Sequence, residues 1–278
     1  MFNGMALNPA YAGSEEVLSL AALYRNSQWG NSVEGAPTTK TFTGNCPLNN
    51  PQIAIGLLIF DDIINMMRSS GTYFAYAYRV RAGDGKLSFG LQAGFDVQHE
   101  DQTLYKKDII HPDDPLFHFK DKYTFMPNAG IGTYYYTTKF FAGLSIPQLL
   151  TYSPQYNKPD KYAGKLSFNK IMLYTGTIVP TSKDVKLKPS ILLQKVDNGM
   201  LLDINCNVLL MKEILELGAS WRTGSTFVAM AQFRKNLLSI GYAYDFAIGK
   251  PSAINMSHEI MLRYDLKIRI KAASPLIL

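Results

Sequence analysis

The sequence predicts an all-β protein, a transmembrane antiparallel up-and-down β-barrel of about 14 strands. Three observations predict it. Strand-length runs alternate between apolar and polar residues, the runs are even in number, and the connections between them alternate between short and long. A polar strand face has two interpretations, however, because it can meet water around a soluble sandwich or line the interior of a membrane barrel. Strand number and loop lengths favour the barrel.

The alternation is most regular over residues 86–98, where every second side chain is apolar and the intervening ones are small or polar. Successive side chains of a strand point to opposite faces. We therefore predict one set that faces lipid, namely Leu87, Phe89, Leu91, Phe95 and Val97. We predict a second set that faces the lumen, namely Ser88, Gln92, Asp96 and Gln98.

Runs of this kind, bounded by turn residues, cover most of the chain. They lie at about 17–29, 39–48, 52–62, 72–82, 86–98, 124–137, 140–151, 165–180, 185–196, 200–211, 214–222, 226–234, 237–247 and 257–267. Proline removes a donor from a strand ladder. We therefore expect Pro127, Pro147, Pro180 and Pro189 near strand ends or bulges.

The connections alternate in length, as in barrels that place short turns on the periplasmic side and long loops outside. Those after even-numbered runs are short: 82–85, 137–139, 181–184, 212–213 and 235–236. Most of those after odd-numbered runs are longer: 30–38, 63–71, 99–123, 152–164 and 248–256. Two exceptions, 197–199 and 223–225, are short. The Gly83-Asp84 pair is typical of a tight hairpin turn.

Composition excludes several other classes. Hydrophobic residues make up 47% of the chain, yet the mean hydropathy is −0.05. The longest apolar run, 53–60, is far shorter than the roughly 18 residues that a spanning helix needs. The net charge of +6 comes from scattered basic residues, which argues against nucleic-acid binding. Cys46 and Cys206 have no CxxC partner, so no zinc site is predicted. The two cysteines could form at most one long-range disulfide.

No catalytic, cofactor or metal site is predicted. His99, His111 and His118 share an acidic segment, but without metal-ligand spacing, and such segments are usually solvated. Asp61 and Asp62 are adjacent in a strand, so their carboxylates should diverge rather than work as an acid–base pair. We therefore predict that the protein is not an enzyme.

Several segments, in co-linear order over essentially the whole chain, resemble the PorP/SprF family of the type IX secretion and gliding-motility machinery of Bacteroidetes. The motif Asn8-Pro9-Ala10-Tyr11-Ala12-Gly13 is similar to the family's NPAYAG segment. Further matching segments are Met1-Phe2-Asn3, Tyr24-Arg25 with Gln28-Trp29, residues 32–37, Gly241-Tyr-Ala-Tyr244-Asp245 and Ser257-His258-Glu259. The family's segment normally follows a signal peptide, and no such peptide stands in this sequence.

The resemblance implies a non-enzymatic outer-membrane barrel that supports secretion and cell-surface attachment of a partner protein, such as an adhesin. The implied partners are a secreted surface protein with a type IX C-terminal signal domain, other type IX components and outer-membrane lipid, without a cofactor. A porin or small-solute uptake barrel is the alternative function. A soluble periplasmic β-domain is a third.

The expected organisation is a periplasmic lead-in segment (1–16), a barrel (17–268) and a C-terminal tail (269–278). For residues 8–13 the structural interpretation is a turn into the first strand, and the functional one is a contact with the secretion machinery. Arg25 and Trp29 also have two interpretations. In the structural one, Arg25 is a charge that faces the lumen and Trp29 is an aromatic residue at the membrane interface. In the functional one, both residues contact a partner protein. The long connection 99–123 is expected to form a lid or a client-docking loop through Pro112, Pro115, Leu116, Phe117 and Phe119.

Overall fold

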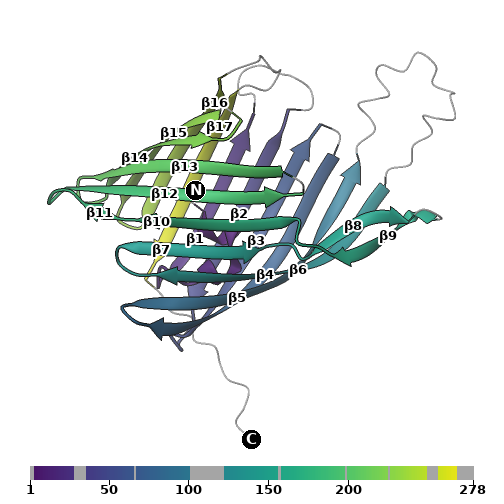
Figure 1. Ribbon diagram of the computed structural model, residues 1–278, viewed down its shortest axis with the longest axis horizontal. Coiled ribbons are helices and arrows are strands. Elements are labelled where there is room, and N and C mark those ends of the chain that lie inside the picture. The colour runs from purple at the N-terminus through teal and green to yellow at the C-terminus, as the bar shows by residue number, and fades with distance from the viewer. Residues whose placement is uncertain are drawn as a thin grey trace, which may run out of the picture.

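The chain forms a closed antiparallel β-barrel whose wall is made of fourteen strands within the described residues (Figure 1). A computed structural model describes residues 3–27, 36–65, 67–100, 122–155, 158–197, 199–224, 226–248 and 256–267. Around the wall the strands follow chain order. The first strand, β1, pairs with the last, β17, over Leu18–Asn26, which closes the barrel.

The wall strands have the following bounds: β1 Leu18–Asn26, β2 Thr38–Pro47, β3 Ile53–Ile64, β4 Met67–Ala82, β5 Gly85–Glu100, β6 Lys122–Tyr136, β7 Phe140–Ile146, β10 Lys170–Thr177, β12 Val185–Val196, β13 Gly199–Leu210, β14 Leu215–Arg222, β15 Thr226–Lys235, β16 Leu238–Ala247 and β17 Met256–Leu266. The two-residue strand β11, Val179–Pro180, pairs with β12. A separate hairpin consists of β8, Leu150–Gln155, and β9, Lys158–Leu166.

The two faces of the wall have opposite chemistry. In β5 the outward side chains of Phe89 and Leu91 are 48% and 60% exposed, whereas Ser88 and Gln92 are 0% and 6% exposed toward the inside. Polar groups are buried and large apolar groups are exposed, the reverse of a water-soluble sandwich. The predicted assignment of residues 87–98 to two faces is confirmed.

The fourteen predicted runs each overlap one wall strand, but several boundaries were wrong. The expected long connection 63–71 is instead a tight turn, because β3 and β4 continue pairing as far as Ile64 and Met67. The run predicted at 165–180 divides into the end of β9, then β10 and β11. Part of the expected loop 152–164 is the β8–β9 hairpin.

The predicted turn at Gly83 and the predicted positions of three prolines differ in how well they agree with the structure. Gly83 has a φ of +58° in the two-residue turn between β4 and β5, as the sequence predicted. Pro147 follows the last residue of β7, and Pro189 lies where β12 changes partner from β10 to β11. Pro127 and Pro189 depart from the expectation, since each lies inside a strand in an unbroken register, Pro127 with β5 and Pro189 with β13.

The two cysteines are free, Cys46 on β2 and Cys206 on β13. The Asp61 and Asp62 carboxylates diverge as expected. Asp61 accepts a hydrogen bond from Arg68 Nε at 2.8 Å, while Asp62 lines an internal cavity. No helix within the described ranges is long and apolar enough to cross a membrane.

Candidate functional site

The lumen is occupied by the chain's own N-terminal segment, residues 3–16, which we call the luminal segment. It contains the short helix α1, Gly4–Leu7, and the 3-10 turn η1, Pro9–Tyr11. Asn8 caps η1, because its Oδ1 accepts a hydrogen bond from the Ala10 amide at 2.9 Å, and proline suits the first position of such a turn. Asn8, Ala10 and Ala12 are each fully buried.

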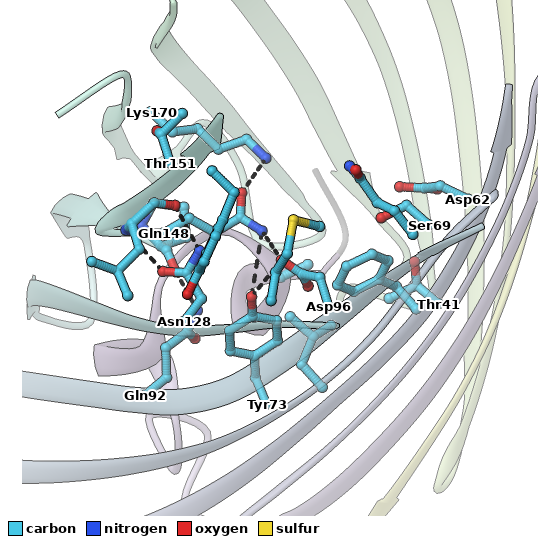
Figure 2. Close-up of a pocket in the computed structure, with 18 of the residues that line it drawn as sticks. Thr41, Asp62, Ser69, Tyr73, Gln92, Asp96, Asn128, Gln148, Thr151 and Lys170 are labelled. Carbon is cyan, nitrogen blue, oxygen red and sulfur yellow. Dashed lines mark hydrogen bonds between the residues drawn. The ribbon is translucent and has the colours of Figure 1, made fainter. Parts of the chain in front are cut away.

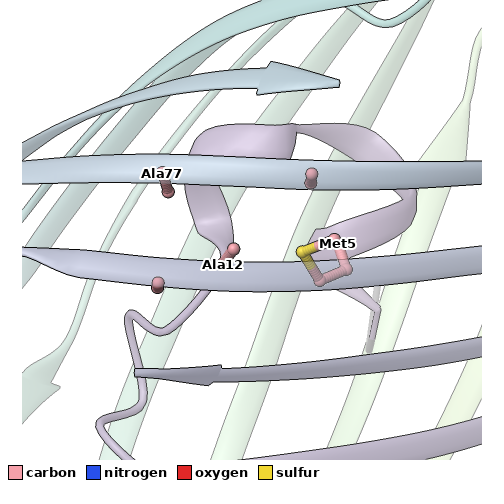
Figure 3. Close-up of a cluster of buried hydrophobic side chains, with 5 residues drawn as sticks. Met5, Ala12 and Ala77 are labelled. Atoms are coloured by element: carbon pink, nitrogen blue, oxygen red, sulfur yellow. The ribbon is translucent and has the colours of Figure 1, made fainter. Parts of the chain in front are cut away.

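Small residues on the inner wall make room for this segment. A Cβ atom at Gly90 would lie 2.1 Å from the Ala10 nitrogen, and one at Gly132 would lie 2.0 Å from Asn8 Oδ1. Glycine inside a strand often marks such a close backbone approach. On the neighbouring strands, Met5 and Ala12 pack against Ala54, Ala75 and Ala77 (Figure 3).

Hydrogen bonds hold the luminal segment to several walls at once. Asn8 Nδ2 donates to the Thr133 carbonyl of β6 at 2.9 Å, and Ser145 Oγ of β7 donates to the Leu7 carbonyl at 2.6 Å. The Gly13 amide donates to Asn45 Oδ1 of β2 at 2.9 Å. Further contacts are the Arg79–Gly13 hydrogen bond and the ion pairs Lys86–Glu16 and Arg263–Glu15. The segment therefore bridges the lumen from β4–β7 to β2 and β17.

Tyr11 lies at the centre of an aromatic group inside the barrel. Its ring centroid is 5.4 Å from that of Tyr134, and its hydroxyl donates to Glu15 Oε1 at 2.7 Å. Burial raises the pKa of the Tyr11 phenol to about 12, although the nearby Arg263 guanidinium acts in the opposite direction. Tyr11 therefore stays neutral at physiological pH and can remain in contact with buried groups.

A second stretch of chain, residues 147–152, turns from the end of β7 into the lumen (Figure 2). Gly130 allows this turn, since a Cβ there would lie 2.4 Å from the Pro147 carbonyl oxygen. Gln92 Nε2 donates to that carbonyl at 2.8 Å, and Asn128 Oδ1 accepts from the Leu149 and Leu150 amides at 3.1 and 3.0 Å. We call this stretch the inward turn.

A polar network supports the inward turn from β4, β5 and β10. Asp96 Oδ2 accepts hydrogen bonds from the Tyr73 hydroxyl at 2.9 Å and from Gln148 Nε2 at 3.0 Å. Lys170 Nζ donates to Gln148 Oε1 at 3.0 Å. The network borders a cavity of about 470 Å³ on one side of the luminal segment (Figure 2). A second cavity, of about 360 Å³, lies toward β12–β17.

The predicted motif residues separate into three groups. Asn8, Pro9, Ala10, Tyr11, Ala12 and Gly13 all belong to the luminal segment, a placement that the sequence pattern did not predict. Arg25 and Asp245 lie on β1 and β16 and form an ion pair inside the barrel, where Glu259 also lines the second cavity.

Tyr24, Tyr244 and His258 face outward. The Tyr244 hydroxyl donates to Met256 Sδ at 2.7 Å, and its ring centroid lies 5.0 Å from that of His258. Gln28 and Trp29, and the loop residues Pro112, Pro115, Leu116, Phe117 and Phe119, lie outside the described residues.

Sequence reasoning missed the residues that receive the two inserted segments. Gly90 and Gly132 seat the luminal segment, and Gly130, Gln92 and Asn128 seat the inward turn. A signal was available for the glycines, because they occupy the luminal parity of their strands and glycine weakens a strand unless another backbone approaches. No such pattern marked Gln92 and Asn128, which resemble ordinary lumen-facing polar residues.

Within the described ranges, no three His, Cys, Asp or Glu side chains are grouped so as to hold a metal ion. The site is instead a barrel interior filled by backbone and small side chains. An apolar exterior, a polar interior and closure by the first and last strands define the class: a membrane-spanning β-barrel of the outer-membrane type.

The family model "Type IX secretion system membrane protein PorP/SprF" matches residues 1–264. The chain therefore belongs to the PorP/SprF family of type IX secretion system membrane proteins, as its motifs predicted. No curated protein sequence matches the chain.

Several solved structures are similar to the chain. The Acinetobacter baumannii outer membrane protein Omp33 is similar with a TM-score of 0.51 and 8% identity, over 90% of this chain and 96% of that one. The KdgM porin has a TM-score of 0.42 and 8% identity, over 88% and 98% of the two chains. Haemophilus ducreyi BamA has a TM-score of 0.45 and 8% identity, over 90% and 70%. At such identities the likeness to Omp33 concerns the barrel fold alone.

Proposed function

We propose that this protein is a non-enzymatic outer-membrane component of the type IX secretion and gliding machinery. It supports secretion and cell-surface attachment of a partner protein, such as an adhesin that carries a type IX C-terminal signal domain. It acts together with other type IX components, and outer-membrane lipid surrounds its apolar outer face. Membership of the PorP/SprF family supports the machinery to which we assign it.

One observation carries the choice of a docking function over a transport function: the chain inserts two of its own segments into the lumen. The luminal segment contacts β2, β4–β7 and β17, and the inward turn adds a second obstruction beside it. A porin or solute-uptake barrel needs a continuous water-filled path, and these two insertions take up part of the lumen that such a path would use. This favours a barrel that presents surfaces to proteins over the porin alternative.

The experiment compares cells with and without the gene and measures protease-accessible partner protein on the cell surface. We expect surface display to be lost without the gene and restored by the wild-type chain. Unchanged display without the gene would contradict the proposal. In planar bilayers the purified protein should give no porin-sized conductance, and a stable open channel of that size would favour the porin function instead.

The connection expected at 99–123, which the bounds of β5 and β6 shorten to 101–121, provides a variant for the same assay. Replacing residues 106–120 by a short Gly-Ser linker should leave the barrel assembled, because loop length is thermodynamically inexpensive to change. Under the docking hypothesis surface display falls, whereas under the lid hypothesis permeability to small solutes rises. A barrel that no longer inserts would contradict both hypotheses for this loop.

A further inference from the structure

One strand of the wall is paired on one side only. β6 pairs with β5 over its whole length, Lys122–Tyr136, but with β7 only over Ile131–Tyr136. β7 stops at Ile146 because the chain then enters the inward turn, and the β8–β9 hairpin forms a sheet of its own. Within the described chain, residues 122–130 of β6 therefore have no ladder partner on the β7 side.

The direction of the β6 backbone groups follows from two hydrogen bonds. The Thr137 amide donates to the Phe140 carbonyl and the Leu149 amide donates to the Ala129 carbonyl, each at 2.8 Å. The backbone N–H and C=O groups of odd-numbered β6 residues therefore point toward the β7 side. The register between β6 and β5 has no shift, so the backbone groups of Tyr123, Phe125 and Pro127 also point toward the β7 side.

Pro127 is tolerated inside β6 for this reason, since its missing N–H would point away from β5. Its carbonyl accepts a hydrogen bond from the Tyr152 hydroxyl. The N–H and C=O groups of Tyr123 and Phe125 remain as an unpaired strand edge within the described residues. We call these two residues the β6 edge. Unpaired edges are templates for an added strand.

The surroundings of the β6 edge differ between the two faces of the wall. Outside, the Tyr123 and Phe125 side chains are 69% and 62% exposed, and the Phe125 ring lies 5.0 Å from that of Phe95. A strand added here would therefore meet an apolar, aromatic outer surface.

Inside, the wall borders the 470 Å³ cavity, whose described lining includes Asp62, Asp96 and one basic residue, Lys170 (Figure 2). Asp62 Oδ1 and Asp96 Oδ1 are buried and have no hydrogen-bond partner. Lys170 Nζ donates to the neutral Gln148 amide and keeps its own charge, so two carboxylates face one cation. The cavity is thus acidic and complements a basic side chain.

We propose that the β6 edge receives an extended segment of the secreted partner protein, which adds a strand to the wall next to β6. Its outward side chains are apolar and pack on Tyr123 and Phe125. At least one inward side chain is Lys or Arg and points into the cavity toward Asp96, which lies on the adjacent strand β5. This inference rests on the proposed function, because it names the surface on which the partner docks.

The decisive variant is Phe125→Pro. It removes the N–H that points to the open side and leaves the β5–β6 ladder intact, as Pro127 already does two residues away. Phe125→Ala is the matched control, since it also loses the ring but keeps the donor. Heat-modifiable gel mobility establishes that each variant still forms a barrel. A third variant, Asp96→Asn, removes the nearest inward charge and keeps an oxygen that can accept the Tyr73 hydrogen bond.

The probe is a fluorescent ten-residue peptide that alternates Val or Tyr with Lys or Ser, with a second peptide carrying Glu for Lys. Binding to the purified full-length barrel is followed by anisotropy. We expect the Lys peptide to bind the wild type, and Phe125→Pro to weaken it about tenfold. Phe125→Ala should weaken binding less than Phe125→Pro does, and Asp96→Asn should reduce the preference for Lys over Glu.

Equal binding to wild type and Phe125→Pro, or no binding to the wild type, would overturn the proposal. Self-association of the wild type that Phe125→Pro abolishes would overturn it too, in favour of a second copy as occupant. In cells, normal surface display of the partner protein with Phe125→Pro would refute the β6 edge as the docking surface. It would leave the proposed function intact. Normal display without the gene refutes the proposed function itself.

Discussion

The outer and luminal faces of the wall formed by β4, β5 and β6 are built on the same strands but follow different rules. Outside, large apolar side chains such as Phe74 and Leu91 are 66% and 60% exposed and have lipid as their neighbour. Inside, Ala75, Ala77 and Gly90 are small because the luminal segment packs directly on them. Lipid sets only the polarity of a face, whereas a packed segment also sets the size of each residue.

The largest expected effect tests the outer face. Leu91→Arg should lower the free energy of unfolding by about 2–4 kcal/mol if residue 91 lies near the bilayer midplane. Denaturant unfolding in lipid vesicles measures it. The luminal control is Thr41→Arg, because Thr41 borders both cavities and an arginine there can reach water. If Thr41→Arg proved more harmful than Leu91→Arg, the assignment of the two faces would be wrong.

The sequence places Gln92 on the luminal face, so from the sequence alone Gln92→Arg would be expected to be mild and to serve as the control. The structure changes that expectation, since Gln92 is buried and its amide holds the Pro147 carbonyl of the inward turn. Gln92→Arg should therefore disturb the inward turn, which makes it unsuitable as a neutral luminal variant.

The next effect tests size on the luminal face. Gly90→Ala places a methyl group 2.1 Å from the Ala10 nitrogen, so the luminal segment must shift. Overpacking of this kind costs about 1–3 kcal/mol. We expect faster labelling of a cysteine introduced at Ala12 in a variant that lacks Cys46 and Cys206.

Gly199→Ala is the matched control for Gly90→Ala, because its nearest non-neighbouring atom, the Val196 carbonyl oxygen, lies at an ordinary 3.5 Å. It should label at the parental rate. If Gly90→Ala labelled at that same rate, the tight packing between β5 and the luminal segment would be refuted.

The smallest effect concerns the protonation of Tyr11. Because its pKa is raised from 10.0 to about 12, the neutral phenol contributes stability that is fully present below pH 10 and is lost as the pH rises toward 12. The same labelling assay should therefore show increasing exposure of the luminal segment over this window. Tyr11→Phe should flatten that part of the profile. An unchanged profile would mean that other groups, such as lysines, control the release.

Much of the wall could be predicted from the sequence because strand formation leaves a local trace. Alternation over residues 86–98 assigns each side chain to a face, and turn residues such as Gly83 mark where the strands end. The boundary near 63–71 was missed because turn-like Ser69, Ser70 and Gly71 can extend a strand when a neighbour already supplies hydrogen bonds. Tertiary pairing decided that boundary.

The sequence by itself determined the barrel class, the number of wall strands and the family, since periodicity and motif order are properties of the chain alone. Only the tertiary structure decided what fills the barrel. Asn8 meets Thr133 and Leu144 across more than a hundred residues, and Arg25 meets Asp245 across the strand between them. The unpaired edge at Phe125 likewise depends on where β7 ends. These contacts depend on which strands become neighbours when the barrel closes, and local sequence patterns carry no record of such long-range partners.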